Sequence, residues 1–274
     1  MAELVGVFAA SHGPLLIREW EAIPSGEQAR LASAFGELGG RISRLDPDVI
    51  VEIAPDHWSN FFLDNLPSVC IGVGEAHDGP PEPWMKAFPH RELPGEPEFA
   101  MHLARTALEN GFEPSLSHRL KLDHGFCIPL WRMALAKLPR IVPMVINSIE
   151  PPLPSISRCF EWGGLLKKAI HSFEKEINVA ILATGGLSHS IGEPTMGAID
   201  EPLDQECIRL FSSPVDRLIS FLEKKLPEAG NGTEEIRNWL VAHGSAGGRG
   251  FELIDYLPVP KVLVGCGFAA WRAR

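Results

Sequence analysis

The sequence lacks the features that mark membrane, secreted and nucleic-acid-binding proteins. No run approaches the roughly 18 to 20 apolar residues of a membrane span, and no basic segment followed by an apolar stretch opens the chain. The five cysteines include no Cys-x-x-Cys pair, so we expect reduced thiols rather than a disulfide framework. The net charge is -10 without a basic cluster, which argues against nucleic acid or an anionic membrane as a partner. These absences predict a cytoplasmic protein that acts on a small molecule.

The chain does have enough apolar residues for one large core, at 274 residues and 45% hydrophobic. Strand-like apolar runs lie at residues 4–10, 49–54, 69–73, 141–146, 179–183 and 262–268, and helical patterns at 28–45, 98–109, 130–138, 164–175, 215–226 and 234–243. This alternation predicts an α/β fold, in which helices flank a central, mostly parallel or mixed sheet within a single domain over residues 1–274. The Gly- and Pro-rich stretch 79–97 is expected to be a surface excursion near a site.

Two of the predicted strands end in a histidine. Ser11-His12-Gly13-Pro14 follows the strand at 4–10, and Pro55-Asp56-His57 follows the strand at 49–54. Ligands of open α/β sheets bind outside the carboxyl ends of the strands, so two imidazoles there indicate a metal site. Asp56 has two interpretations that the sequence leaves open, since its carboxylate would either orient the neighbouring imidazole or cap the next turn.

Ionisable side chains also stand at other element boundaries. They occur in Leu122-Asp123-His124-Gly125 before a helical pattern, in Gly185-Gly186-Leu187-Ser188-His189 after a strand, and in Glu234-Glu235-Ile236-Arg237-Asn238-Trp239 at the start of a helix. Two histidines and one carboxylate form the facial triad typical of non-haem Fe(II) oxygenases, which leaves positions open for substrate and dioxygen. The Gly-Gly turn lacks the lysine and the glycine spacing of a phosphate-binding loop.

Taken in order, these five motifs resemble the class III extradiol ring-cleaving dioxygenases, the family of protocatechuate 4,5-dioxygenase β subunits and 2,3-dihydroxyphenylpropionate 1,2-dioxygenases. The resemblance runs from residue 12 to residue 239. It implies that His12, His57 and Glu235 are the ligands of Fe(II), with Glu234 left open as the alternative glutamate. It also implies that His189 and His124 are catalytic histidines, the latter oriented or polarised by Asp123.

The resemblance implies extradiol (meta) cleavage of a catecholic substrate with incorporation of O2, in the catabolism of aromatic compounds. An imidazole near its usual pKa suits removal of a proton from the diol, the role expected for His189, and His124 is expected to deliver a proton later. The segment Cys70-Ile71-Gly72-Val73-Gly74 is closer to the dihydroxyphenylpropionate branch of the family. The chain is however shorter than is usual in that branch, mostly between residues 189 and 235. The catechol is therefore not identified. A homo-oligomer is expected by analogy, and a small accessory subunit over the site is left open.

Two other functions compete with ring cleavage. The same ligands would serve zinc in a metal-dependent hydrolase, and a non-catalytic binding homologue on this scaffold would have lost a ligand, which this chain has not. The remaining histidines are expected at the surface or in caps, with His243 the nearest of them to the site; they are His77, His90, His102, His118, His171 and His243.

Overall fold

The apolar, β-branched runs of the sequence form the inner strands of an eight-stranded sheet in the computed structural model, which describes residues 1–272. The strands of the sheet are β1 (Glu3–Ala10), β2 (Val49–Ala54), β3 (Val69–Gly72), β6 (Ser115–Ser117), β7 (Arg140–Ile146), β8 (Asn178–Thr184), β9 (Phe251–Val259) and β10 (Val264–Trp271). They are arranged in the order β6-β3-β7-β2-β8-β1-β10-β9. Two further strands, β4 (Ala76–Asp78) and β5 (Glu92–Pro94), pair with each other within the predicted excursion.

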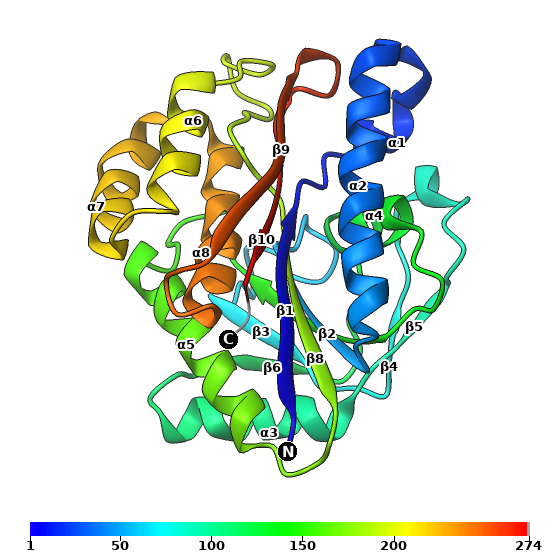
Figure 1. Ribbon diagram of the computed structural model, residues 1–274, viewed down its shortest axis with the longest axis vertical. Helices are drawn as coiled ribbons and strands as arrows, with labels where there is room; N and C mark the ends of the chain where they lie inside the picture. The colour runs from blue at the N-terminus through cyan, green and yellow to red at the C-terminus, as the bar shows by residue number, and fades with distance from the viewer. Residues whose placement is uncertain (273–274) are drawn as a thin grey trace.

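Helices cover both faces of the sheet (Figure 1). The α-helices are α1 (Leu15–Arg18), α2 (Ser25–Leu45), α3 (Pro97–Glu109), α4 (His124–Met133), α5 (Ile156–Ser172), α6 (Glu201–Leu210), α7 (Val215–Lys225) and α8 (Ile236–Ser245). Short 3-10 helices lie at Trp20–Ala22, Pro83–Met85, Leu226–Glu228, Asn231–Glu235 and Pro260–Val262. The fold is therefore the predicted α/β architecture.

Two apolar cores lie on the two faces of the sheet. Residues Val49, Val51 and Ile53 of β2 pack in the core shared with α3, α5 and α8, whereas Ile50 and Ala54 pack in the core beneath α2 and α4. Because both faces are covered, the inner strands are apolar throughout rather than alternating.

The sheet is mixed, and its parallel centre brings the site together. β7, β2, β8 and β1 are parallel neighbours, while β10 and β9 join antiparallel at one edge. Ala10 of β1 lies opposite Thr184 of β8, and Ile53 of β2 lies opposite Ala183. The three strands thus end at the same level, and the segments that carry His12, His57 and His189 leave the sheet side by side.

The prediction of a helix at 130–138 was wrong in the bounds of the helix. Helix α4 begins at His124, because the Asp123 carboxylate accepts a hydrogen bond from Gly125 N at 2.8 Å and caps the helix. It ends at Met133, and Ala134 adopts a left-handed conformation (φ 47°). α5 also begins earlier than expected, at Ile156, and β10 starts two residues later than the predicted strand. β9 and α6 were not predicted.

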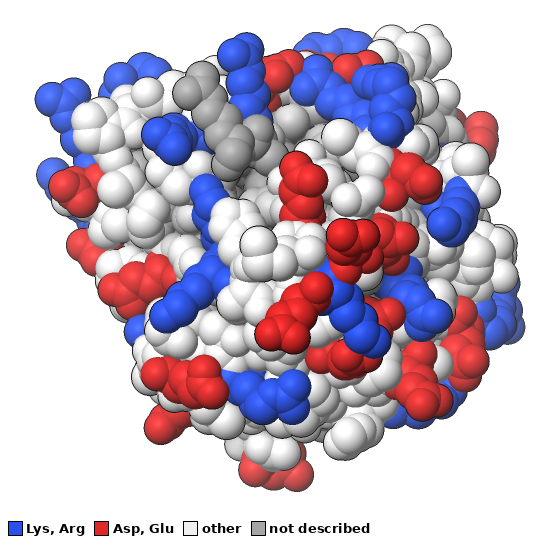
Figure 2. Space-filling model, turned by 60° about the horizontal axis from the view of Figure 1, so that its bottom comes forward, with Lys and Arg blue, Asp and Glu red and all other residues white. Residues whose placement is uncertain are grey.

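Charged side chains are mixed in sign over the end of the molecule at which β1 begins. Figure 2 shows this face, with acidic and basic groups interspersed rather than segregated. Ion pairs that reach the surface of the molecule include Arg140–Glu96 (3.3 Å) and Arg158–Glu161 (3.0 Å). Over residues 1–272, no helix has the length and apolar character needed to cross a bilayer.

Candidate active site

His12 is fixed at the end of β1 by the neighbouring strand. The residue is 3% exposed, and its Nδ1 lies 3.0 Å from Oγ1 of Thr184 at the end of β8. Its other ring nitrogen, Nε2, lies 3.3 Å from Oε1 of Glu235. The threonine therefore occupies one nitrogen and leaves Nε2 turned toward the carboxylate.

His57 is held by Asp123 rather than by the adjacent Asp56. The Asp123 carboxylate accepts a hydrogen bond from His57 N at 2.7 Å and lies 3.4 Å from His57 Nδ1. Burial lowers the pKa of His57, but the carboxylates of Asp123 and Glu235 outweigh it and raise that pKa to about 10. Asp56 instead accepts hydrogen bonds from the backbone amides of residues 59–61, so of its two interpretations the structure supports the cap.

Glu235 joins the two histidines. It is 2% exposed, and its Oε1 lies 3.4 Å from Nε2 of His57 as well as 3.3 Å from Nε2 of His12. Its Oε2 accepts a hydrogen bond from Gly186 N at 2.7 Å. Burial would raise the pKa of Glu235, but the facing histidines hold it well below its usual value, so the side chain is a carboxylate. The neighbouring Glu234 turns away and pairs with Arg237.

Glycine is required where the chain passes this cluster. A Cβ on Gly185 would lie 2.5 Å from Oε2 of Glu235 and 3.0 Å from Cε1 of His12, and the residue has φ +102°. A side chain there would displace the carboxylate and strain the backbone. The Gly-Gly turn thus lets the backbone approach Glu235, a structural reason that the sequence alone did not supply.

His124 stands beside the cluster on the first turn of α4. Its ring centroid lies 4.0 Å from that of His57 and 5.7 Å from that of His12, and nitrogens of these three histidines lie within 4.8 Å of one another. Glu82 holds it: Oε1 of Glu82 accepts a hydrogen bond from His124 N at 2.9 Å and lies 2.7 Å from His124 Nδ1. Asp123, expected to orient or polarise His124, does not orient it, because its carboxylate is bonded to His57. It acts on His124 through its charge alone, which opposes the lowering of the His124 pKa by burial.

His189 follows β8 and has a defined tautomer when neutral. Its Nδ1 lies 2.9 Å from the carbonyl oxygen of Leu187, which only accepts, so Nδ1 carries the proton and Nε2 the lone pair. Nε2 lies 3.9 Å from Oε2 of Glu235. A Cβ on Gly232 would lie 2.1 Å from this nitrogen, so glycine is needed for the imidazole to occupy its position.

A cavity of about 510 Å³ lies over these side chains and is lined by His12, His57, His124, His189 and Glu235. Apolar side chains make up most of the remaining wall, among them Leu15, Trp58, Ile149, Met196 and Leu263. An apolar cavity with a few convergent polar groups is the usual form of a small-molecule site. The volume is in the range of such sites.

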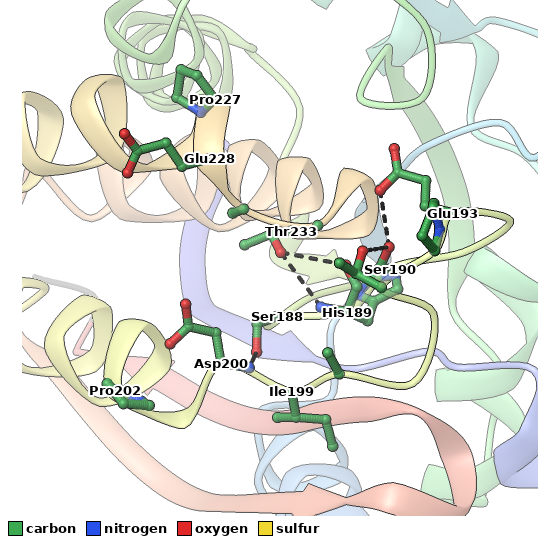
Figure 3. A pocket seen from close by; sticks show the side chains of 15 residues that line it. Ser188, His189, Ser190, Glu193, Ile199, Asp200, Pro202, Pro227, Glu228 and Thr233 are labelled. Atoms are coloured by element: carbon green, nitrogen blue, oxygen red, sulfur yellow. Dashed lines mark hydrogen bonds between the residues drawn. The ribbon is translucent and has the colours of Figure 1, made fainter.

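A second cavity, of about 670 Å³, is lined by the segment 188–190 and so also reaches His189 (Figure 3). Thr233 Oγ1 lies 3.4 Å from His189 N, and Ser188 Oγ accepts a hydrogen bond from Asp200 N at 2.8 Å. The buried Asp204 accepts from Ser188 Oγ at 2.7 Å and from Tyr256 Oη at 2.6 Å. These contacts hold the backbone on which His189 stands.

The structure thus gathers all the candidate site residues of the sequence: His12, His57, His124, His189, Asp123 and Glu235. It adds Glu82 and Thr184, to which sequence reasoning gave no role: Glu82 lies outside the motifs, and Thr184 directly precedes the Gly-Gly turn without a feature that links it to His12. The Gly- and Pro-rich composition of 79–97 was the available signal for Glu82. His243, expected to come nearest among the other histidines, is instead buried in the core, where its Nδ1 accepts a hydrogen bond from Trp271 Nε1 at 2.9 Å.

Comparison with known proteins agrees with this arrangement. A 2,3-dihydroxyphenylpropionate/2,3-dihydroxicinnamic acid 1,2-dioxygenase of Klebsiella pneumoniae (strain 342) is 28% identical over 94% of this chain and 95% of its own length. A protein of the same name from Photorhabdus laumondii is 28% identical over 87% of each chain. The crystal structure of an uncharacterized protein from Escherichia coli K12 shares the fold, with a TM-score of 0.62 and 17% identity over 97% of this chain and 99% of that one.

The model of one family, described as the catalytic LigB subunit of aromatic ring-opening dioxygenase, matches residues 6–264. The match covers every residue of the cluster and of the cavity wall, while most of β10 lies beyond it. The chain therefore belongs to the LigB family of aromatic ring-opening dioxygenase catalytic subunits.

Proposed function

We propose that this protein cleaves the ring of a catecholic compound by an extradiol reaction that depends on Fe(II) and incorporates dioxygen. The observation that carries the proposal is the meeting of three donor atoms: Nε2 of His12 and Nε2 of His57 lie 3.3 and 3.4 Å from Oε1 of Glu235. Two imidazoles and one carboxylate are the donor set of non-haem Fe(II) oxygenases.

The supports behind the donors fit a metal centre. Histidine ligands usually have their second nitrogen bonded to a carboxylate, carbonyl or hydroxyl, which fixes the ring. Thr184 does this for His12 and Asp123 does it for His57. His12, His57 and Glu235 would hold Fe(II), which when bound supplies a centre that chelates the diol and passes electrons from the ring to dioxygen.

His189 is the proposed base. The diol must lose a proton to chelate, and the acceptor must be a side chain with a lone pair directed into the cavity. Nε2 of His189 can accept this proton. Its Nδ1 is bonded to the Leu187 carbonyl, which leaves the lone pair on Nε2, and the side chain lines the cavity. The proton removed from the diol would reside on Nε2, where the Glu235 carboxylate, 3.9 Å away, stabilises the resulting positive charge.

His124 is the proposed proton donor for the later bond-breaking step. Glu82 occupies its Nδ1, so Nε2 is the ring nitrogen free to exchange a proton with a bound ligand. The Glu82 carboxylate favours the protonated form of the ring, whereas burial and the neighbouring His57 lower the pKa of His124 below its usual value and so favour release of the proton. The two histidines come from different segments and line the same cavity, so one substrate would meet both.

The test is oxygen consumption by protein purified without air and loaded with either ferrous iron or zinc. With a catechol, the ferrous protein should consume O2, place both atoms of labelled dioxygen in the product and give the yellow ring-opened compound. The zinc protein should show none of these three results. Hydrolysis supported by zinc without oxygen consumption would replace this proposal with the hydrolase alternative, and failure of the ferrous protein on a broad catechol panel would favour a binding protein.

A further inference from the structure

The wall of the active-site cavity has one cationic side chain outside the histidine–glutamate cluster. Among the described residues, its other polar side chain is Asn231, whose amide is engaged with the segment at Ile191: Nδ2 donates to Ile191 O and Oδ1 accepts from Ile191 N, both at 2.9 Å. The rest of the wall is apolar or glycine. Arg18 is therefore the wall residue with a permanent positive charge and donors free for a ligand.

Arg18 is held at this position by its helix. It ends α1, which starts three residues after His12, and Leu16 of the same helix is fully buried. Arg132 donates a hydrogen bond to the Leu16 carbonyl and ties α1 to α4. The Arg18 side chain is exposed, and no hydrogen bond or ion pair joins it to another residue within 1–272, so its backbone is fixed while its guanidinium stays available.

The Trp84 ring lies near both the guanidinium and the metal-binding cluster. Cζ of Arg18 is 5.8 Å from the ring centroid of Trp84, and the Trp84 ring is 5.7 Å from that of His124. Trp84 lies near both side chains but does not itself line the cavity. A ligand in the cavity that reaches from His124 to Arg18 would contact apolar wall along its middle, and only its two ends would meet polar groups.

We propose that Arg18 binds a carboxylate carried on a side arm of the substrate, so that the cavity selects catechols with an anionic arm over neutral or cationic ones. This inference rests on the proposed ring cleavage. An anion on an apolar wall loses hydration, and a guanidinium that accepts the carboxylate in its two-pronged geometry compensates for the loss. Because the whole chain carries a net charge of -10, an anion needs such a local cation.

The experiment compares three catechols that differ only in the end of the arm: 2,3-dihydroxyphenylpropionate, its neutral amide and the corresponding amine. Arg18→Gln should lower kcat/KM for the acid by about 10- to 100-fold, the range of a hydrogen-bonded charge pair, and leave the amide within about twofold. Arg18→Glu should prefer the amine to the acid. Arg105→Gln, an exposed arginine on α3 at the far end of the sheet, is the matched control and should change none of these values.

A parallel drop for acid and amide in Arg18→Gln, or no drop for the acid, would overturn the inference while leaving ring cleavage intact. Binding measured by calorimetry under nitrogen, with the ferrous protein, separates the two proposals. If the wild type consumes no oxygen with any catechol, ring cleavage fails. Arg18 is still supported if Arg18→Gln weakens binding of the acid alone, and is rejected if its affinities equal those of the wild type.

Discussion

The cavity and the packed core beneath it both bury histidines, but the two regions treat them differently. In the cavity, carboxylates lie against three of the imidazoles: Asp123 and Glu235 at His57, Glu235 at His12, and Glu82 at His124. In the core, His77 and His243 have no carboxylate hydrogen-bond partner, and burial lowers the pKa of each to about 4. The partner, rather than burial itself, distinguishes a histidine that can bind metal or carry a proton from one that fills space.

The largest effect is expected where a donor of the cluster is removed. His12→Ala, His57→Ala and Glu235→Ala should each lose bound iron and at least about a thousandfold in turnover, because a facial site with two ligands no longer holds the metal. Iron content after desalting and oxygen uptake are the measurements. Glu234→Ala is the control, since its side chain pairs with Arg237, and it should retain most of the iron. Loss of iron from Glu234→Ala alone would show that the ligand assignment is off by one residue.

Removal of a proposed acid or base should lower turnover less than removal of a ligand does, and should leave the metal in place. His189→Ala and His124→Ala should keep iron and lose about 100-fold in turnover, the usual contribution of a general acid or base. His189→Ala should recover partly at high pH, where the catechol ionises unaided, whereas His124→Ala should bind the catecholate and stall. The pH profile of turnover and the ultraviolet spectrum of the anaerobic complex distinguish them. Identical profiles in the two variants would contradict the division of roles.

Substitution of the two carboxylates behind the histidines should have a smaller effect on activity. The two variants should differ in whether iron binding or turnover is reduced. Asp123→Asn should weaken iron binding by about 10-fold or more, because Asp123 supports a proposed ligand, while Glu82→Gln should spare iron affinity and lower turnover by about 10-fold. Titration of ferrous iron and steady-state kinetics measure the two quantities. Equal losses of iron affinity in both variants would indicate that His124 is itself a ligand.

Substitution of a core histidine should have the smallest effect on turnover at neutral pH. The property it should change is the stability of the fold in acid. An unfolded histidine has a pKa near 6.5, whereas His243 folds with a pKa of about 4, so protons bind the unfolded chain preferentially. The stabilisation is present above pH about 6.5 and is lost as pH falls toward 4, by about 2 kcal/mol between pH 7 and 5. His243→Gln should flatten the dependence of the unfolding free energy on pH. His118→Gln, at an exposed position, should keep the wild-type slope.

The inner strands and the site histidines could be predicted because both follow from local patterns. The run at 49–54 coincides with β2, and a histidine directly after a buried strand must leave the sheet at its carboxyl edge. The partners of those histidines could not be predicted in the same way. Asp123 is adjacent in sequence to His124 but contacts His57, which is 66 residues away, because the capped start of α4 turns its carboxylate back toward β2.

Other misses have equally specific causes. The amphipathic pattern at 130–138 hid the true start of α4, where an Asp cap preceded a short apolar helix interrupted by Pro129. His243 lies on a helix whose residues are all buried, so no exposed face distinguished it from a cavity residue. The cytoplasmic location, the homo-oligomer and the accessory subunit stay predictions, since no feature of a single chain tests them.

The glycines that crowd the cluster have a consequence for how this protein can be changed. Gly185 and Gly232 leave no room for a side chain beside Glu235 and His189, so the chemistry at that end of the cavity is closed to gradual variation. Arg18, by contrast, stands exposed on a four-residue helix, and Trp84 lies in a connecting segment. A library for altered substrate preference should therefore randomise these two positions and keep the glycines fixed. Relatives that evolved to act on other substrates would be expected to differ at Arg18 and Trp84 and to keep both glycines.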